Sequence, residues 1–160
     1  MKRTISPLGA IAVTVSALTV GSFTPAVAQA DETSVKFSSP SGNIHCVIDA
    51  YDEPTPTALC QIEEISYEVP VGVGRDENGG SCPHRTGSGN DFRLDQGQPG
   101  FIRCSFAALG GGVGPWPRLD YGQSRSFGAI RCDSAASGVT CTDTGTGHFF
   151  RVSRDHYELG

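Results

Sequence analysis

The fold is decided by the stretch Arg131-Cys-Asp-Ser-Ala-Ala-Ser-Gly-Val-Thr-Cys-Thr-Asp-Thr-Gly-Thr-Gly-His-Phe-Phe-Arg-Val-Ser-Arg-Asp-His-Tyr157. Side chains alternate along a strand, and Cys132 and Cys141 each lie two residues from an apolar side chain on the same face. Both sulfur atoms are therefore expected to point inward. The segment Asp143–Gly147 has turn chemistry, and the aromatic and β-branched run after it predicts a third strand. The stretch thus predicts three short strands held together by a disulfide.

Short alternating runs continue upstream of this unit. Strands are expected at residues 35–39, 44–48, 59–63, 92–94 and 101–106. Residues 65–69 either continue the third of these strands or form one of their own. No window of the chain after residue 30 has a convincing helical period. We therefore predict an all-β fold, a small disulfide-stapled antiparallel sandwich or partly open barrel of short strands.

The first 30 residues have the features of a cleavable secretory signal. Lys2 and Arg3 precede an apolar run, Leu8–Val20, and Ala28-Gln29-Ala30 offers small residues at the cleavage positions. The apolar run is too short to span a bilayer, and no later stretch is longer. We expect cleavage after Ala30, which leaves a single β domain at 31–160, secreted and without a membrane anchor.

The charge of the chain argues against nucleic acid as a partner. Twelve Lys and Arg stand against 17 Asp and Glu, and removal of Lys2 and Arg3 with the signal makes the remainder more acidic still. A protein that binds nucleic acid needs a basic face to neutralise phosphates. No cofactor motif accompanies this acidic composition, so no cofactor is expected.

Six cysteines in a secreted chain of this size predict a disulfide framework. They are Cys46, Cys60, Cys82, Cys104, Cys132 and Cys141. Spacing alone leaves the pairing open, but strand phase favours sequential pairing. In this pairing Cys46 bonds to Cys60, Cys82 to Cys104 and Cys132 to Cys141. A zinc site would need a Cys-x-x-Cys pair, which the chain lacks, so no metal is expected.

Four polar residues are candidates for ligand contact: Asn43, His148, Arg151 and Arg154. The arginines could clamp an anionic glycan or phosphate, or simply pair with nearby acids. His148 shares a strand face with Phe150, which favours a half-buried imidazole that pins the turn at Gly147. It is also the candidate base of a small hydrolase, although no Gly-x-Ser-x-Gly motif supplies a nucleophile. No catalytic residue is therefore assigned.

Several short motifs together resemble those of a known family. They are Phe37-x-Ser-Pro-Ser-Gly-Asn-Ile-x-Cys46, Leu119-x-Tyr-Gly122, Ser137-Gly-Val-Thr-Cys-Thr142, Gly147-His-x-Phe150 and Ser153-Arg154. The combination resembles a family of small secreted actinobacterial proteins that is classed only as a domain of unknown function. The resemblance implies secretion and a disulfide scaffold, and it carries no activity to transfer.

These observations favour a non-enzymatic binding or structural module at or outside the cell envelope, with an extracellular partner that the sequence does not specify. The loops Ser41–Asn43, Gly145–His148 and Arg151–Arg154 are the expected contact surface. Two alternatives stay open. One is a small extracellular hydrolase that uses His148. The other is an inhibitor of an extracellular protease that presents the loop Gly110–Pro117.

Overall fold

The computed structural model describes residues 34–50, 54–76, 78–83, 87, 89–104, 108–109 and 115–160. The signal expected at residues 1–30 and most of the loop proposed for protease inhibition, residues 110–114, lie outside the described residues.

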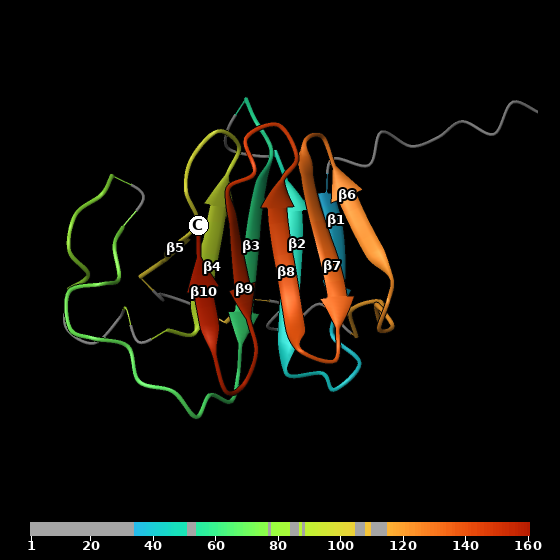
Figure 1. The fold of residues 1–160 in the computed structure, drawn as a ribbon, viewed down its shortest axis with the longest axis horizontal. Helices are drawn as coiled ribbons and strands as arrows, with labels where there is room; N and C mark the ends of the chain where they lie inside the picture. Colours follow the sequence, from blue (N-terminus) through green and yellow to red (C-terminus); the bar gives the residue numbers. More distant parts are fainter. Residues whose placement is uncertain are drawn as a thin grey trace, which may run out of the picture. The chain divides into compact units, whose positions relative to one another are not determined.

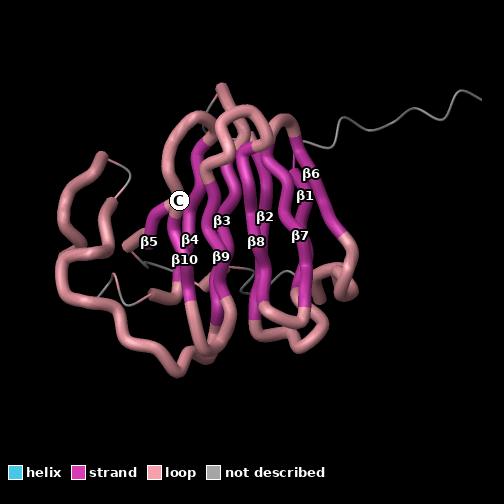
Figure 2. The backbone as a smooth tube through the Cα atoms, viewed as in Figure 1, coloured by secondary structure: helices cyan, strands magenta, loops and turns pink. Residues whose placement is uncertain are grey.

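The described chain is all-β and forms two antiparallel sheets of five strands each, which face one another in an open sandwich (Figures 1 and 2). The first sheet contains, in spatial order, β1 (Ser34–Ser38), β2 (Ile44–Asp49), β3 (Thr57–Ile62), β4 (Asp91–Asp95) and β5 (Phe101–Ile102). The second contains β6 (Ser124–Phe127), β7 (Ile130–Ala135), β8 (Gly138–Asp143), β9 (Phe149–Val152) and β10 (Tyr157–Leu159), again in chain order. Each sheet is a simple meander, and the predicted all-β sandwich is confirmed.

The core lies between the two sheets because each strand turns its apolar positions to the same side. In β3 and β8 burial alternates strictly along the strand, as the period of two requires. Phe92 of β4 and Phe150 of β9 are fully buried, and their ring centroids lie 5.8 Å apart across the core. In β2, Val47 is also buried although it faces away from this core, so the first sheet is covered on part of its outer face.

Three disulfides hold the sandwich, and they confirm the sequential pairing. Cys46–Cys60 joins β2 to β3, and Cys132–Cys141 joins β7 to β8. In both bonds the two cysteines occupy directly opposed positions of neighbouring strands, which is why strand phase alone favoured these partners. The sulfurs of Cys60 and Cys141 lie 3.7 Å apart, so the two bonds touch across the core. The third bond, Cys82–Cys104, ties the long β3–β4 loop to the chain after β5.

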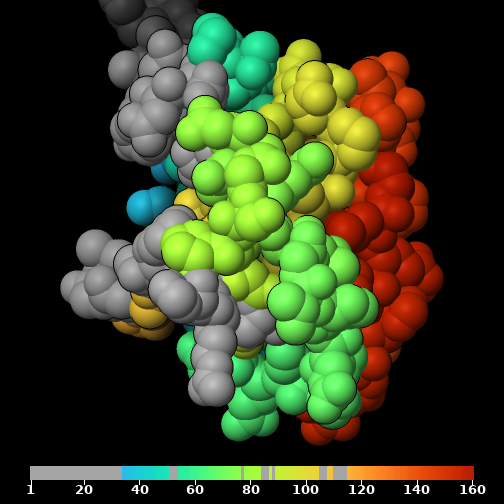
Figure 3. Space-filling view, turned by 90° about the vertical axis from the view of Figure 1, so that its left-hand side faces the viewer, coloured from blue at the N-terminus to red at the C-terminus, as the bar shows by residue number. Residues whose placement is uncertain are grey.

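The β3–β4 loop lies along one side of the sandwich, at the edge formed by β5 and β10. Figure 3 looks onto this side and shows the loop in green beside the red C-terminal strands. The Tyr67 hydroxyl donates to the Gly89 carbonyl at 2.7 Å, and the Tyr67 ring packs on Tyr157 at 5.1 Å. Residues 65–69, which were expected to be a strand, form none. They leave the sheet because their backbone bonds to turns instead: Ser66 N–H donates to the Arg154 carbonyl.

Three further elements differ from the sequence prediction, and one of them is β6, which was not expected as a strand. Of the strand expected at 101–106, residues 105–106 lie outside the described residues. The strand β5 ends after Ile102, and Arg103 forms only an isolated bridge with Arg75. The C-terminal strand β10 was not expected, because three residues are too few to show a period. It exists because it pairs with β9, and Gly160 and Phe149 exchange two backbone hydrogen bonds at its end.

Candidate binding pocket

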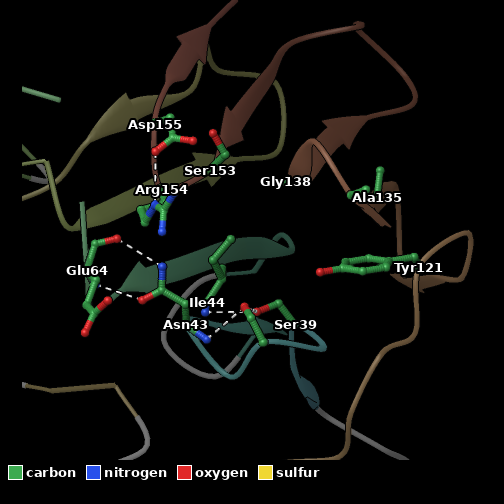
Figure 4. A pocket seen from close by; sticks show the side chains of 12 residues that line it. Ser39, Asn43, Ile44, Glu64, Tyr121, Ala135, Gly138, Ser153, Arg154 and Asp155 are labelled. Atoms are coloured by element: carbon green, nitrogen blue, oxygen red, sulfur yellow. Dashed lines mark hydrogen bonds and ion pairs between the residues drawn. The ribbon is translucent and has the colours of Figure 1, made fainter. Parts of the chain in front are cut away.

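A polar pocket of about 380 Å³ lies at one end of the sandwich, among turns that are lowest in Figure 1. Three turns meet there: β1–β2 from the first sheet, and β7–β8 and β9–β10 from the second. The lining residues are Ser39, Ser41, Asn43, Ile44, Glu64, Tyr121, Ala135, Ala136, Gly138, Ser153, Arg154 and Asp155 (Figure 4). We call this site the turn pocket.

The β1–β2 turn forms the floor of the pocket and explains the Ser-Pro-Ser-Gly-Asn motif. Ser39 is buried, and its N–H donates to the Ile44 carbonyl at 2.8 Å while its hydroxyl accepts from the Ile44 N–H at 3.1 Å. Gly42 has φ +76°, which an L side chain rarely adopts. The motif therefore encodes a rigid turn whose upper surface is exposed to the pocket.

Asn43 ties this turn to the segment that follows β3. Its side-chain NH₂ donates to the Glu64 carbonyl at 3.0 Å, and its side-chain oxygen accepts from the Glu64 N–H at 2.8 Å. The two bonds imitate a strand pairing and place Glu64 at the rim of the pocket (Figure 4). Asn43 lies in the pocket, as a ligand-contact residue would, but both polar ends of its amide are engaged in holding the wall.

The β9–β10 turn supplies the charged wall. Arg154 Nε donates to Asp155 Oδ1 at 3.0 Å, and the Ser66 hydroxyl donates to the same oxygen at 2.9 Å. The hydrogen bond from Arg154, followed by that from Ser66, lowers the pKa of Asp155 below its usual value. The bond to Asp155 raises the pKa of Arg154, and the charge of Glu64 adds to this effect. The wall therefore carries one guanidinium and two carboxylates.

Tyr121 forms the opposite wall. It projects from a turn that is anchored on both sides: Leu119 is fully buried in the core, and Gly122 N–H donates to the Ser134 carbonyl at 2.8 Å. The Tyr121 side chain is 54% exposed. Figure 4 shows its hydroxyl directed across the cavity toward the side where Asn43 and Arg154 lie. The pocket thus has an aromatic wall facing a charged one.

Two of the four candidate residues lie in this pocket and two do not. Asn43 and Arg154 are brought together from opposite sheets. Arg151 lies on β9, where Nη2 pairs with Glu158 Oε1 at 2.6 Å. His148 lies in the β8–β9 turn. Figure 1 shows this turn at the opposite end of the sandwich from the β9–β10 turn. Of the three loops expected to form a contact surface, the structure therefore joins Ser41–Asn43 with the end of Arg151–Arg154.

The β8–β9 turn is pinned by Asp143 and not by the imidazole of His148. The buried Asp143 carboxylate accepts from the N–H groups of Gly97 at 2.7 Å and Gly145 at 2.9 Å, and from the Thr146 hydroxyl at 2.9 Å. Burial acts to raise the pKa of Asp143, but these hydrogen bonds outweigh it and hold the pKa below its usual value. The expected role of His148 in the turn is wrong: within the described part of the chain, its ring has no hydrogen bond or ion pair.

Sequence reasoning missed the groups that make the pocket chemically useful. Tyr121 was noted only as part of a motif, and neither Glu64 nor Asp155 was among the candidate residues. A signal for Tyr121 did exist, since it is a polar aromatic residue directly before a glycine and two residues after a leucine. No comparable signal marked Glu64, whose position depends on Asn43.

The described residues contain one close group of metal-type ligands. The sulfurs of Cys46, Cys60 and Cys141 lie within 4.8 Å of one another. Each of them is bonded to another sulfur in a disulfide, so none offers the thiolate that binds zinc. This group is a packing contact between two disulfides.

Comparison of the chain with protein-family models, with curated proteins and with solved structures gave no significant match. The resemblance of the Phe37–Cys46 and Ser137–Thr142 motifs to secreted actinobacterial proteins therefore stays a prediction. Within the part of the chain that the structure describes, no helix could cross a membrane.

Proposed function

We propose that this protein is an exported, non-enzymatic binding module that acts at or outside the cell envelope and holds its ligand in the turn pocket. The observation that carries the proposal is the convergence of three turns, from two sheets, around an exposed aromatic ring and a charged wall. A volume of about 380 Å³ falls within the usual range of small-molecule sites, about 300–1,000 Å³.

The rigidity of the pocket supports binding. The backbone of its walls is cross-linked. Glu63 N–H donates to the Asn43 carbonyl within the first sheet, and Ser66 N–H donates to the Arg154 carbonyl, which joins the β3–β4 loop to the second sheet. A site that is held in shape before the ligand arrives loses less entropy on binding. The disulfide-stapled strands beneath these turns act as the scaffold.

The expected export supports the location. Residues 1–30 have the pattern of a secretory signal. Three disulfides suit an oxidising compartment, and they leave no free cysteine. We therefore place the ligand outside the cell, among small molecules or polymers of the envelope.

Sedimentation with cell walls tests this function. The exported protein is mixed with insoluble cell walls of the source organism, and the bound fraction is measured. We expect binding that falls at least tenfold in the double variant Tyr121→Ala/Arg154→Ala, which removes the aromatic ring of one wall and the guanidinium of the other. Arg131→Ala is the matched control, because Arg131 forms a similar exposed pair with Asp133 on the outer face of β7. Equal binding by the double variant and the wild type would rule out the turn pocket as the site.

A further inference from the structure

Most hydroxyl groups of the turn pocket are already committed to the turns. Ser39 and Ser41 bond to each other and to the backbone of the β1–β2 turn. The Ser153 hydroxyl donates to the His156 carbonyl and accepts from the His156 N–H. These groups shape the pocket and are not available to a ligand.

The groups available to a ligand lie on the two opposing walls. One wall offers the ring and the hydroxyl of Tyr121. The other offers the Nη groups of Arg154, the carboxylate of Glu64 and the second oxygen of Asp155, none of which is bonded to a residue that the structure describes. The pocket thus presents both hydrogen-bond donors and hydrogen-bond acceptors opposite an aromatic face.

The charge of the pocket disfavours an anionic ligand. Arg154 is the one basic residue among the twelve that line it, and it is paired with Asp155. The Glu64 carboxylate then leaves the pocket with a net charge of −1. A phosphate, sulfate or carboxylate would bring a second negative charge beside two carboxylates, and like charges brought together at a binding site are unfavourable. The clamp for an anionic glycan or phosphate, one reading of Arg154, is therefore not supported.

The same geometry disfavours a strongly cationic ligand. The Nη groups of Arg154 share the wall with the two carboxylates, so an ammonium group bound there would meet a guanidinium. One oxygen of Asp155 already accepts two hydrogen bonds. A ligand that suits this wall must both donate and accept hydrogen bonds without carrying charge.

We infer that the turn pocket binds a neutral oligosaccharide, an inference that rests on the proposed binding function. Sugar hydroxyls donate to carboxylates and accept from a guanidinium, so adjacent hydroxyls match the Arg154, Asp155 and Glu64 wall. The C–H face of a sugar ring is apolar and packs on an exposed aromatic ring such as that of Tyr121. The pocket supplies both surfaces on opposite sides of one cavity (Figure 4).

An NMR titration of the exported, isotope-labelled protein tests the ligand class. The probes are neutral glucan, mannan, galactan and chitin oligosaccharides, with inorganic phosphate and a trilysine peptide for comparison. We expect a neutral oligosaccharide to shift the side-chain N–H signals of Arg154 and Asn43. Tyr121→Ala should weaken its binding about tenfold, equivalent to about 1.4 kcal/mol. Tyr121→Phe, which keeps the ring, should weaken it much less, and Arg131→Ala should not change it.

The outcomes separate the ligand class from the function. Binding of phosphate or trilysine in the pocket, without binding of any neutral oligosaccharide, would overturn the ligand class and leave the binding function intact. If none of the probes binds, while the protein still sediments with cell walls through the pocket, the ligand class is also overturned. If the double variant Tyr121→Ala/Arg154→Ala sediments with cell walls as well as the wild type does, the binding function proposed for the pocket is overturned too.

Discussion

At the residue scale, two buried aspartates show how local contacts decide the state of a charge. Asp91 and Asp143 are each about 1% exposed. Burial raises the pKa of Asp91, and the hydrogen bond from Gln61 and the charge of Arg103 only partly oppose this. At Asp143 burial acts in the same direction, but several N–H and O–H donors reverse it. The same residue type therefore holds a turn through hydrogen bonds to its carboxylate at Asp143, and is a desolvated acid with a raised pKa at Asp91.

The first prediction concerns Asp143. Asp143→Asn should lower the free energy of unfolding by about 2 kcal/mol at pH 7, because an NH₂ group then faces buried N–H donors. Urea unfolding measures this value. The pKa of Asp143 is lower in the folded protein, so its contribution is present above the unfolded value of about 4 and is lost as the pH falls through the folded value.

The difference between Asp143→Asn and wild type should therefore shrink below about pH 4. Asp133→Asn, an exposed carboxylate on β7, is the control and should change stability by less than about 0.5 kcal/mol. If the difference in unfolding free energy between the two proteins is constant from pH 7 to pH 3, the ionised carboxylate of Asp143 is not what holds the turn.

The second prediction concerns the wall of the turn pocket. Asn43→Ala should release the Glu64 N–H, whose bond to the Asn43 side chain has a length of 2.8 Å, and cost about 1 kcal/mol. Hydrogen exchange at Glu64 measures the release. The neighbouring Glu63 N–H is an internal control, because it bonds to the backbone carbonyl of Asn43 and should stay protected. Equal protection of Glu64 in wild type and variant would show that Asn43 does not position this wall.

At the element scale, each sheet is stapled in the same place. A disulfide joins the second strand to the third in both meanders, and both bonds are fully buried. Crosslinks between directly opposed positions of neighbouring strands hold the register. A slip by one residue would turn the buried side chains of a strand from the core to the surface. The staples therefore protect the burial pattern on which the core depends.

The third prediction follows from these staples. Replacement of Cys46 and Cys60 by alanine should lower the free energy of unfolding by about 3 kcal/mol, from the entropy of the segment that the bond closes. Urea denaturation under non-reducing conditions measures it. Replacement of Cys82 and Cys104, which hold a loop, serves as a comparison and should leave the turn pocket competent to bind. A loss below about 1 kcal/mol for the Cys46 and Cys60 variant would contradict the role given to this staple.

At the scale of the whole molecule, the two sheets are joined by packing and by polar contacts between described residues. The shared core lies between them, and a polar contact lies near each end: Ser66 with Arg154 beside the turn pocket, and Gly97 with Asp143 at the opposite end. No disulfide crosses from one sheet to the other, although the Cys60 and Cys141 sulfurs lie 3.7 Å apart. The sandwich therefore stays together by packing and turn contacts.

The fourth prediction uses that proximity. If Cys46 and Cys132 are both replaced by alanine, Cys60 and Cys141 are left as neighbouring thiols and should oxidise to a bond between the sheets. Peptide mapping under non-reducing conditions detects the new bond, and a thiol assay should find no free cysteine. Persistent free thiols at both positions, in a variant that still folds, would show that the sheets do not approach as closely as this contact requires.

Much of the scaffold was predictable because it depends on local chemistry. Alternation with a period of two placed Cys46, Cys60, Cys132 and Cys141 on inner faces, and phase then indicated their partners. The Ser-Gly turns were visible because glycine and serine have specific roles in turns. Residues 65–69 were not predictable, because Ser66 bonds to Arg154, far away along the chain. The strand β10 was not predictable for another reason, since three residues are too few to show a period.

The sequence by itself determined an all-β chain, the positions of its turns and the sulfur partners, since each of these follows from residues close together or from the phase of a strand. Only the tertiary structure decided which turns share an end of the sandwich. Tyr121, Glu64 and Arg154 are distant in sequence and meet because two meanders face each other across one core. The pocket therefore depends on how the two sheets pack, which no local sequence pattern predicts.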